Sequence, residues 1–158
     1  MELGIKILIV VATFITMEFV TWLTHKYVMH GFLWYLHKDH HQPLYGMFEK
    51  NDAFFLIFAI PSFLLMLFGA KAGFDYRFCI GLGVMFYGFA YFFVHDIFIH
   101  QRFKLFRNTN SLYFKGLRKA HKVHHKHLGK EEGECFGMLL VPFKYYREAA
   151  KSKSLLDA

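Results

Sequence analysis

The chain has 158 residues, of which 55% are hydrophobic and 20% aromatic, and its formal net charge is +7. This length fits a single domain covering residues 1–158. The composition excludes an ordinary soluble domain, because the apolar residues gather in runs long enough to cross a bilayer.

Three apolar runs follow one another along the chain. The first contains only two charged side chains, those of Lys6 and Glu18, the second contains none, and the third contains none as far as Val94. A helix of about 20 mostly apolar residues crosses the roughly 30 Å hydrocarbon core of a membrane. The sequence therefore predicts membrane-spanning helices at about residues 3–24, 53–70 and 78–99.

Two segments need separate interpretation. The first run is too long for the apolar part of a signal peptide and lacks a small-residue cleavage site, so we expect a retained anchor. The apolar part of residues 134–146 is too short to cross easily, which favours an interfacial helix over a fourth span. In the third run, Gly81, Gly88 and Ala90 predict close packing against neighbouring helices.

The topology places every histidine at one side of the membrane. The short link Lys71–Arg77 joins the second and third spans, so residues 25–52 and 95–158 emerge together at the opposite face. Of the 19 Lys and Arg residues, 16 lie on that face, and positive residues near span ends favour the cytoplasm. We therefore expect an all-α, integral membrane bundle of three or four spans with a cytoplasmic, histidine-rich helical cap.

Ten of the eleven histidines form two matched pairs of motifs, each an HxxxxH followed by an HxxHH. Neutral imidazole is the commonest protein ligand for transition metals, and ten ligands are too many for one ion. The pattern thus predicts a site for two metal ions, with all ten as candidate ligands: His25, His30, His37, His40, His41, His95, His100, His121, His124 and His125.

The two spacings predict different roles. Histidines three and four residues apart share a face of an α-helix, so each HxxHH should act as a compact chelate. Histidines five residues apart lie about 140° apart on an α-helix. His25 and His30 are therefore expected to reach towards different ions.

The all-nitrogen set of candidate ligands limits which metals are suitable but does not identify one. Nitrogen ligands suit iron, zinc, copper or nickel. Iron is favoured by the absence of sulfur ligands and by the lipid surroundings, where an iron pair could activate dioxygen against a dissolved hydrocarbon.

Carboxylates near the motifs are candidates for orienting the imidazoles or relaying protons. Asp39 and Asp96 lie inside the motifs, and Glu49 and Asp52 lie just before the second span; each could instead be a solvated interfacial charge. Glu18 lies inside a span, where a carboxylate marks function by default. With Thr21 and His25 it forms one helical stripe, although a structural hydrogen bond between helices is the competing interpretation.

The segment 101–130 contains nine Lys or Arg residues and no acidic residue. Such a segment is typical of contact with anionic lipid head groups. It also suits an acidic electron donor, because opposite charges steer docking. Binding to nucleic acid is not expected here, since the segment adjoins membrane spans and candidate metal ligands.

Several stretches resemble the bacterial β-carotene 3-hydroxylases of the fatty acid hydroxylase superfamily, over about residues 15–142. Ile97 replaces a glycine that many members have, at a spacer position. The matching stretches are Met17-Glu18, THKYVMHGFLW at 24–34, HKDHHQP at 37–43, FEKND at 48–52, VHDIFIHQR at 94–102 and AHKVHH at 120–125.

The resemblance implies a non-haem di-iron monooxygenase of the inner membrane that hydroxylates C3 of the rings of β-carotene, giving β-cryptoxanthin and then zeaxanthin. It also implies dioxygen and reduced ferredoxin as co-substrates. From the charge of the basic face 102–130 we expect this donor to dock there. The residues alone leave open a carotenoid ketolase, a fatty-acid or sphingolipid hydroxylase, or a sterol desaturase. A metal transporter or sensor is less favoured, because transporter ligands lie near the bilayer midplane.

Overall fold

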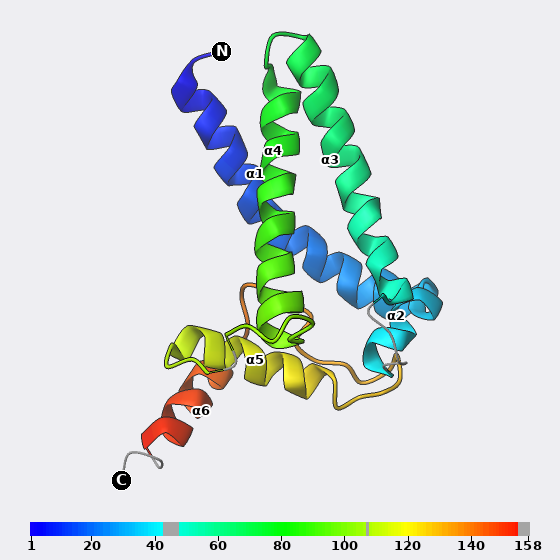
Figure 1. The fold of residues 1–158 in the computed structure, drawn as a ribbon, viewed down its shortest axis with the longest axis vertical. Coiled ribbons are helices and arrows are strands. Elements are labelled where there is room, and N and C mark those ends of the chain that lie inside the picture. Colours follow the sequence, from blue (N-terminus) through cyan, green and yellow to red (C-terminus); the bar gives the residue numbers. More distant parts are fainter. Residues whose placement is uncertain (43–47, 107, 155–158) are drawn as a thin grey trace.

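The computed structural model describes residues 1–42, 48–106 and 108–154, and all regular structure within them is helical (Figure 1). Pro43 of one matching stretch and Arg107 of the basic segment lie outside these ranges. The elements are α1 (Leu3–Leu23), η1 (Thr24–Phe32), α2 (Trp34–His41), η2 (Lys50–Asp52), α3 (Ala53–Lys71), α4 (Tyr76–Tyr91), η3 (Phe92–Ile99), α5 (Leu112–His124) and α6 (Phe143–Ser154).

The three predicted spans are confirmed as helices long and apolar enough to cross a membrane. They are Leu3–Phe32, Lys50–Lys71 and Tyr76–Ile99. The first is longer than expected, because α1 continues into η1, whereas the other two agree with the predicted bounds to within three residues, and the third ends at Ile99 as expected. Large apolar side chains on their outer faces are exposed, including Ile15 and Phe63. An apolar outer surface is what a helix in contact with lipid requires.

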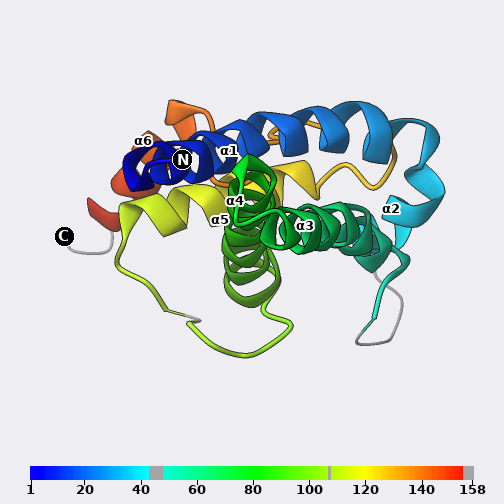
Figure 2. The same ribbon diagram turned by 90° about the horizontal axis from the view of Figure 1, so that it is seen from above.

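Helix α4 is the central span and packs against both α1 and α3 (Figures 1 and 2). Glycines permit the close approach: a Cβ at Gly83 would lie 2.7 Å from the Cβ of Thr13 in α1. Gly81 meets α3 in the same way, and its carbonyl accepts a 2.8 Å hydrogen bond from the Ser62 hydroxyl. The expectation for Gly88 is wrong, since a Cβ there would meet nothing within 4 Å.

The predicted hairpin between the second and third spans is confirmed. Helix α3 ends at Lys71 and α4 begins at Tyr76. Gly73 turns the chain with a φ of +80°, a conformation that costs glycine little. The Asp75 carboxylate then caps α4 by accepting a 3.0 Å hydrogen bond from the Arg77 N–H.

At the other end of the spans, α2 and α5 lie beside the ends of η1 and η3 (Figure 1). The segment from 125 to 142, here called the connecting segment, joins α5 to α6 without helical structure. The expectation of an interfacial helix at 134–146 is therefore wrong for its first nine residues. Polar groups of this backbone are bound by Glu18, by histidine side chains, and by the side chains of Gln42 and Tyr113.

The glycine contacts predict a difference between two substitutions in α4. Gly83→Ala should destabilise the bundle by about 1–3 kcal/mol, because the added methyl group overpacks the contact with α1. Gly88→Ala is the matched control and should be neutral or stabilising by up to about 1 kcal/mol, as alanine favours helix. Unfolding in mixed detergent micelles measures both; equal effects would contradict the packing described here.

Candidate metal centre

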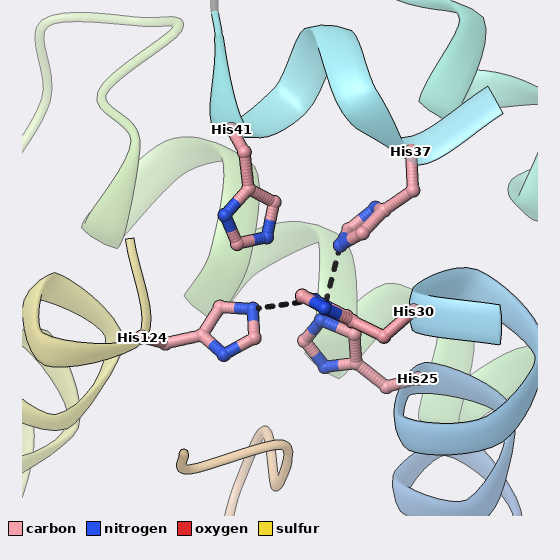
Figure 3. A group of neighbouring side chains, drawn as sticks. All are labelled: His25, His30, His37, His41 and His124. Atoms are coloured by element: carbon pink, nitrogen blue, oxygen red, sulfur yellow. Dashed lines mark hydrogen bonds between the residues drawn. The ribbon is translucent and has the colours of Figure 1, made fainter. Parts of the chain in front are cut away.

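Nine histidines converge in two clusters at the end of the bundle, with the ligand nitrogens of each cluster within 4.8 Å of one another. All are buried except His100, which is half-buried. The five-histidine group, shown in Figure 3, consists of His25, His30, His37, His41 and His124. The four-histidine group consists of His40, His95, His100 and His121.

The HxxxxH motifs lie on π-helices, which overturns one expectation. His25 and His30 lie in η1, and both belong to the five-histidine group. His95 in η3 and His100 directly after it both belong to the four-histidine group. A π-helix repeats its hydrogen bonds every five residues, so positions i and i+5 come onto one face. Each HxxxxH therefore serves one group, and does not divide between two.

The HxxHH motifs behave in the opposite way. His37 and His41 join the five-histidine group, whereas His40 between them points into the four-histidine group. In the second motif His121 and His124 are likewise separated between the two groups. The expectation of a compact chelate from each HxxHH is therefore wrong. Each HxxHH motif instead supplies histidines to both groups and so links one group to the other.

His125 contacts both groups without belonging to either. Its ring stacks on that of His41 with centroids 4.4 Å apart, and it lies 4.5 Å from the ring of His121. The Nε2 atoms of His41 and His125 are both buried without a hydrogen-bond partner. Buried polar atoms are rarely left unpaired in folded proteins. These two nitrogens are thus available to bind something.

The outer nitrogens of the five-histidine group are all occupied. Carbonyl oxygens cannot donate, so each Nδ1 that faces one must carry the proton. Four acceptors are carbonyls of the chain from His127 onwards, and the fifth is the amide oxygen of Asn51. The Nδ1 donors and their acceptors are His25 to Phe136 at 3.0 Å, His30 to Lys130 at 3.1 Å, His41 to His127 at 2.9 Å, His124 to Glu134 at 2.8 Å and His37 to Asn51 at 2.7 Å.

A protonated Nδ1 leaves the inner Nε2 of a neutral imidazole with a bare lone pair. Several of these nitrogens face one another at short range, and Figure 3 marks two such contacts with dashed lines. The Nε2 pairs are His25 with His37 at 3.2 Å, His30 with His124 at 3.2 Å and His40 with His95 at 3.0 Å, and the Nε2 atoms of His100 and His121 also lie 2.7 Å apart.

Protonation is a poor way to relieve this repulsion. Burial lowers the pKa of His37 and that of His124 to about 2 each. Burial also lowers the pKa of His40 well below its usual value, with further lowering by His95. At neutral pH these three imidazoles stay uncharged. Inward lone pairs of imidazoles suit transition-metal ions such as iron, zinc, copper or nickel. The residues therefore fit two metal ions.

Two carboxylates serve the four-histidine group. The Glu49 Oε2 accepts a 2.8 Å hydrogen bond from the Nδ1 of His40, and the Asp96 Oδ2 lies at a long 3.4 Å from the Nδ1 of His95. The Arg102 guanidinium forms ion pairs with both carboxylates: one of its nitrogens lies 3.1 Å from Glu49 Oε2, and its Nε lies 3.1 Å from Asp96 Oδ1. Burial raises the pKa of the Glu49 carboxyl, which the guanidinium opposes.

The remaining candidates lie differently. Asp39 accepts a 2.6 Å hydrogen bond from the backbone N–H of Lys50, and no contact with a histidine occurs within the described residues. Asn51 and Arg102 were not predicted from the sequence as parts of the site. Both lie inside matching stretches, but a guanidinium is not a metal ligand and an amide is an uncommon ligand for transition metals, so ligand spacing could not reveal them.

Glu18 binds backbone, not histidine. Its carboxylate accepts hydrogen bonds of 2.9–3.1 Å from the N–H groups of Met138, Leu139 and Leu140. The Tyr87 hydroxyl donates to its other side at 2.6 Å and contacts the Thr21 hydroxyl at 2.7 Å. Glu18 therefore fixes the connecting segment just beyond the carbonyls that orient the five-histidine group.

A cavity of about 490 Å³ lies beside the four-histidine group. Its lining includes His40, His100 and His121 together with the cationic residues Arg118 and Lys122. This cavity brings small molecules within reach of that group.

Three apolar spans with two all-imidazole clusters at their common end define a helical membrane protein with sites suited to a pair of transition metals. A family model described as fatty acid hydroxylase matches residues 10–144. The chain therefore belongs to the fatty acid hydroxylase family, which makes the protein an oxygenase.

Relatives support this assignment over most of the chain. A β-carotene hydroxylase from Pantoea ananas is 42% identical over 135 residues, which cover 85% of this chain and 77% of that protein. A β-carotene hydroxylase from Pseudescherichia vulneris is 38% identical over 149 residues, covering 94% and 81%. A β-carotene hydroxylase from Paracoccus sp. (strain PC1) is 36% identical over 138 residues, covering 87% and 85%. No solved structure matches the chain.

The geometry predicts opposite outcomes for two neighbouring histidines. His124→Ala should remove one of two bound metal ions, because it deletes an inward nitrogen of the five-histidine group. His127→Ala should retain both, since that residue supplies only its backbone carbonyl to His41. Metal analysis of the purified variants checks this; full metal content in His124→Ala would refute the ligand assignment.

A second prediction concerns Glu18. In Glu18→Gln one amide oxygen replaces a charged group that accepts several N–H bonds, and bonds to charged groups contribute about 1.5–3 kcal/mol each. Loss of one such bond would accelerate amide hydrogen exchange at residues 138–140 at least about tenfold, because about 1.5 kcal/mol corresponds to a tenfold change in the opening equilibrium. Glu2→Gln, at the exposed start of the same helix, is the control. Unchanged exchange in Glu18→Gln would show that the carboxylate does not fix the segment.

Proposed function

We propose that this protein is a β-carotene 3-hydroxylase that converts β-carotene to zeaxanthin through β-cryptoxanthin. The observation that carries the proposal is the placement of both histidine groups at the common end of three lipid-exposed spans. A membrane dissolves the hydrocarbon substrate, and the similarity to bacterial β-carotene hydroxylases indicates the substrate class. We assign all ten motif histidines, including His125, as ligands of two non-haem iron ions.

The reaction inserts one oxygen atom into a ring C–H bond. One dioxygen, two electrons and two protons give one C–OH group and one water. Bound iron would supply the activation of dioxygen. The chain's own contribution is to hold seven of the Nε2 atoms inward, through the acceptors on their Nδ1 atoms, and to bury most of the site away from bulk water.

The two electrons come, in this proposal, from reduced ferredoxin docked at the basic face 102–130. Nine cationic residues without an acidic one lie in segment 101–130, which suits an acidic donor. We place the protein in the inner membrane with the histidine groups on the cytoplasmic side. The excess of Lys and Arg beyond that end of the spans supports this orientation.

The substrate is tested by expression in bacteria that accumulate β-carotene, followed by pigment chromatography. We expect β-cryptoxanthin and zeaxanthin to appear, and the His37→Ala variant to leave β-carotene unchanged. Canthaxanthin in place of zeaxanthin would instead identify a ketolase. Unchanged pigment with a well-expressed, metal-loaded protein would exclude a carotenoid substrate and favour another lipid.

A further inference from the structure

The two histidine groups differ in the charge that surrounds them. Every Nδ1 acceptor of the five-histidine group is uncharged, being a backbone carbonyl or the amide of Asn51. The four-histidine group has the carboxylates of Glu49 and Asp96 at the same positions. Both groups offer imidazole nitrogens as ligands, but the hydrogen-bond acceptors on the Nδ1 atoms are uncharged in one group and negatively charged in the other.

One short stretch of chain creates most of this difference. Glu49 and Asn51 are separated by one residue at the turn η2, and they face opposite groups. Glu49 bonds His40 of the four-histidine group, and Asn51 bonds His37 of the five-histidine group. His37 and His40 are neighbours on one face of α2, so a single turn of chain orients both.

The negative charge near the four-histidine group is only partly compensated. Arg102 contacts Glu49 and Asp96 at 3.1 Å, and Asp52 at 2.8 Å. Within this cluster one guanidinium contacts three carboxylates, which leaves an excess of negative charge beside His40 and His95. The cations Arg118 and Lys122 line the cavity next to His100 and His121. In the half-buried surroundings of these side chains that charge is screened less than it would be in bulk water.

A carboxylate that accepts from Nδ1 raises the electron density at Nε2 and with it the basicity of the ligand. A nearby negative charge also favours the more positive of two charge states of a bound ion. We propose that Glu49 and Asn51 make the two metal positions unequal, with ferric iron favoured in the four-histidine group and ferrous iron in the five-histidine group. This inference rests on the proposed iron site but not on the identity of the substrate.

The test uses the full-length protein, purified in detergent and loaded anaerobically with ferrous iron. Ferricyanide oxidises the two ions in successive one-electron steps, and each electron lost by iron reduces one ferricyanide to ferrocyanide. Optical and Mössbauer spectra follow the two midpoint potentials. We expect two separate midpoints in the parent protein, with the lower one belonging to the four-histidine group.

Two reciprocal substitutions assign the midpoints. Glu49→Gln keeps an oxygen for His40 but removes the charge, and should raise only the lower midpoint. Asn51→Asp adds a charge behind His37 and should lower only the upper midpoint. In each case the ferric-to-ferrous ratio at the affected ion should change about tenfold or more, the range over which partners outside the ligand set act. Each variant is the control for the other.

The outcomes separate clearly. Selective shifts in opposite directions support the inference even if no carotenoid is hydroxylated, in which case only the proposed substrate fails. Coincident midpoints in the parent protein, or equal shifts of both midpoints in either variant, would overturn it. If Glu49→Gln fails to retain iron, Asn51→Asp alone decides, because it leaves the carboxylates of the four-histidine group in place.

Discussion

The structure depends on bringing ten imidazoles together with several of their inner nitrogens turned towards one another. Burial removes the option of protonation, and lone pairs at about 3 Å repel unless something positive lies between them. The surrounding chain is arranged to enforce this condition. Carbonyls, an amide and carboxylates accept the outer protons, so that the tautomer of the histidines with such a partner is set from outside.

The membrane spans and the site are mechanically one unit. Histidines His25 and His95 lie on continuations of α1 and α4, so the packing of these two spans sets the distance between their rings. Glu18 adds a second link, because it binds the connecting segment whose carbonyls orient four imidazoles. A carboxylate inside an apolar helix is costly, and here it is balanced by backbone N–H groups that have no helical partner.

Composition and apolar runs were enough to predict the spans, the hairpin and the gathering of the histidines at one end. These features follow from hydrophobic length, which is a property of the sequence alone. The division of the ligands was predicted wrongly, because the spacing was interpreted on an α-helix with 3.6 residues per turn. The π-helical stretches at His25–His30 and before His100 change this geometry, and the apolar pattern of the sequence does not distinguish a π-helix from an α-helix.

The partners of the histidines were predicted least well. Glu49 was named as a candidate and lies against His40, whereas Asn51 and Arg102 were missed, and Glu18 contacts the connecting segment and not a ligand. Backbone carbonyls supply four of the acceptors, and any residue can provide a carbonyl. The amino-acid sequence therefore does not reveal which backbone carbonyls accept hydrogen bonds from the histidines, although carbonyls are the commonest acceptors in the site.

The contact between His30 and His124 joins residues separated by 94 positions along the chain. During synthesis the first histidine motif emerges long before the last, so an early metal ion meets only a fraction of its ligands. Complete coordination has to wait until all three spans are in the membrane and α5 has been made. The separation of these ligands along the sequence thus couples metal binding to completed membrane insertion, because the full set of ligands exists only in the folded chain.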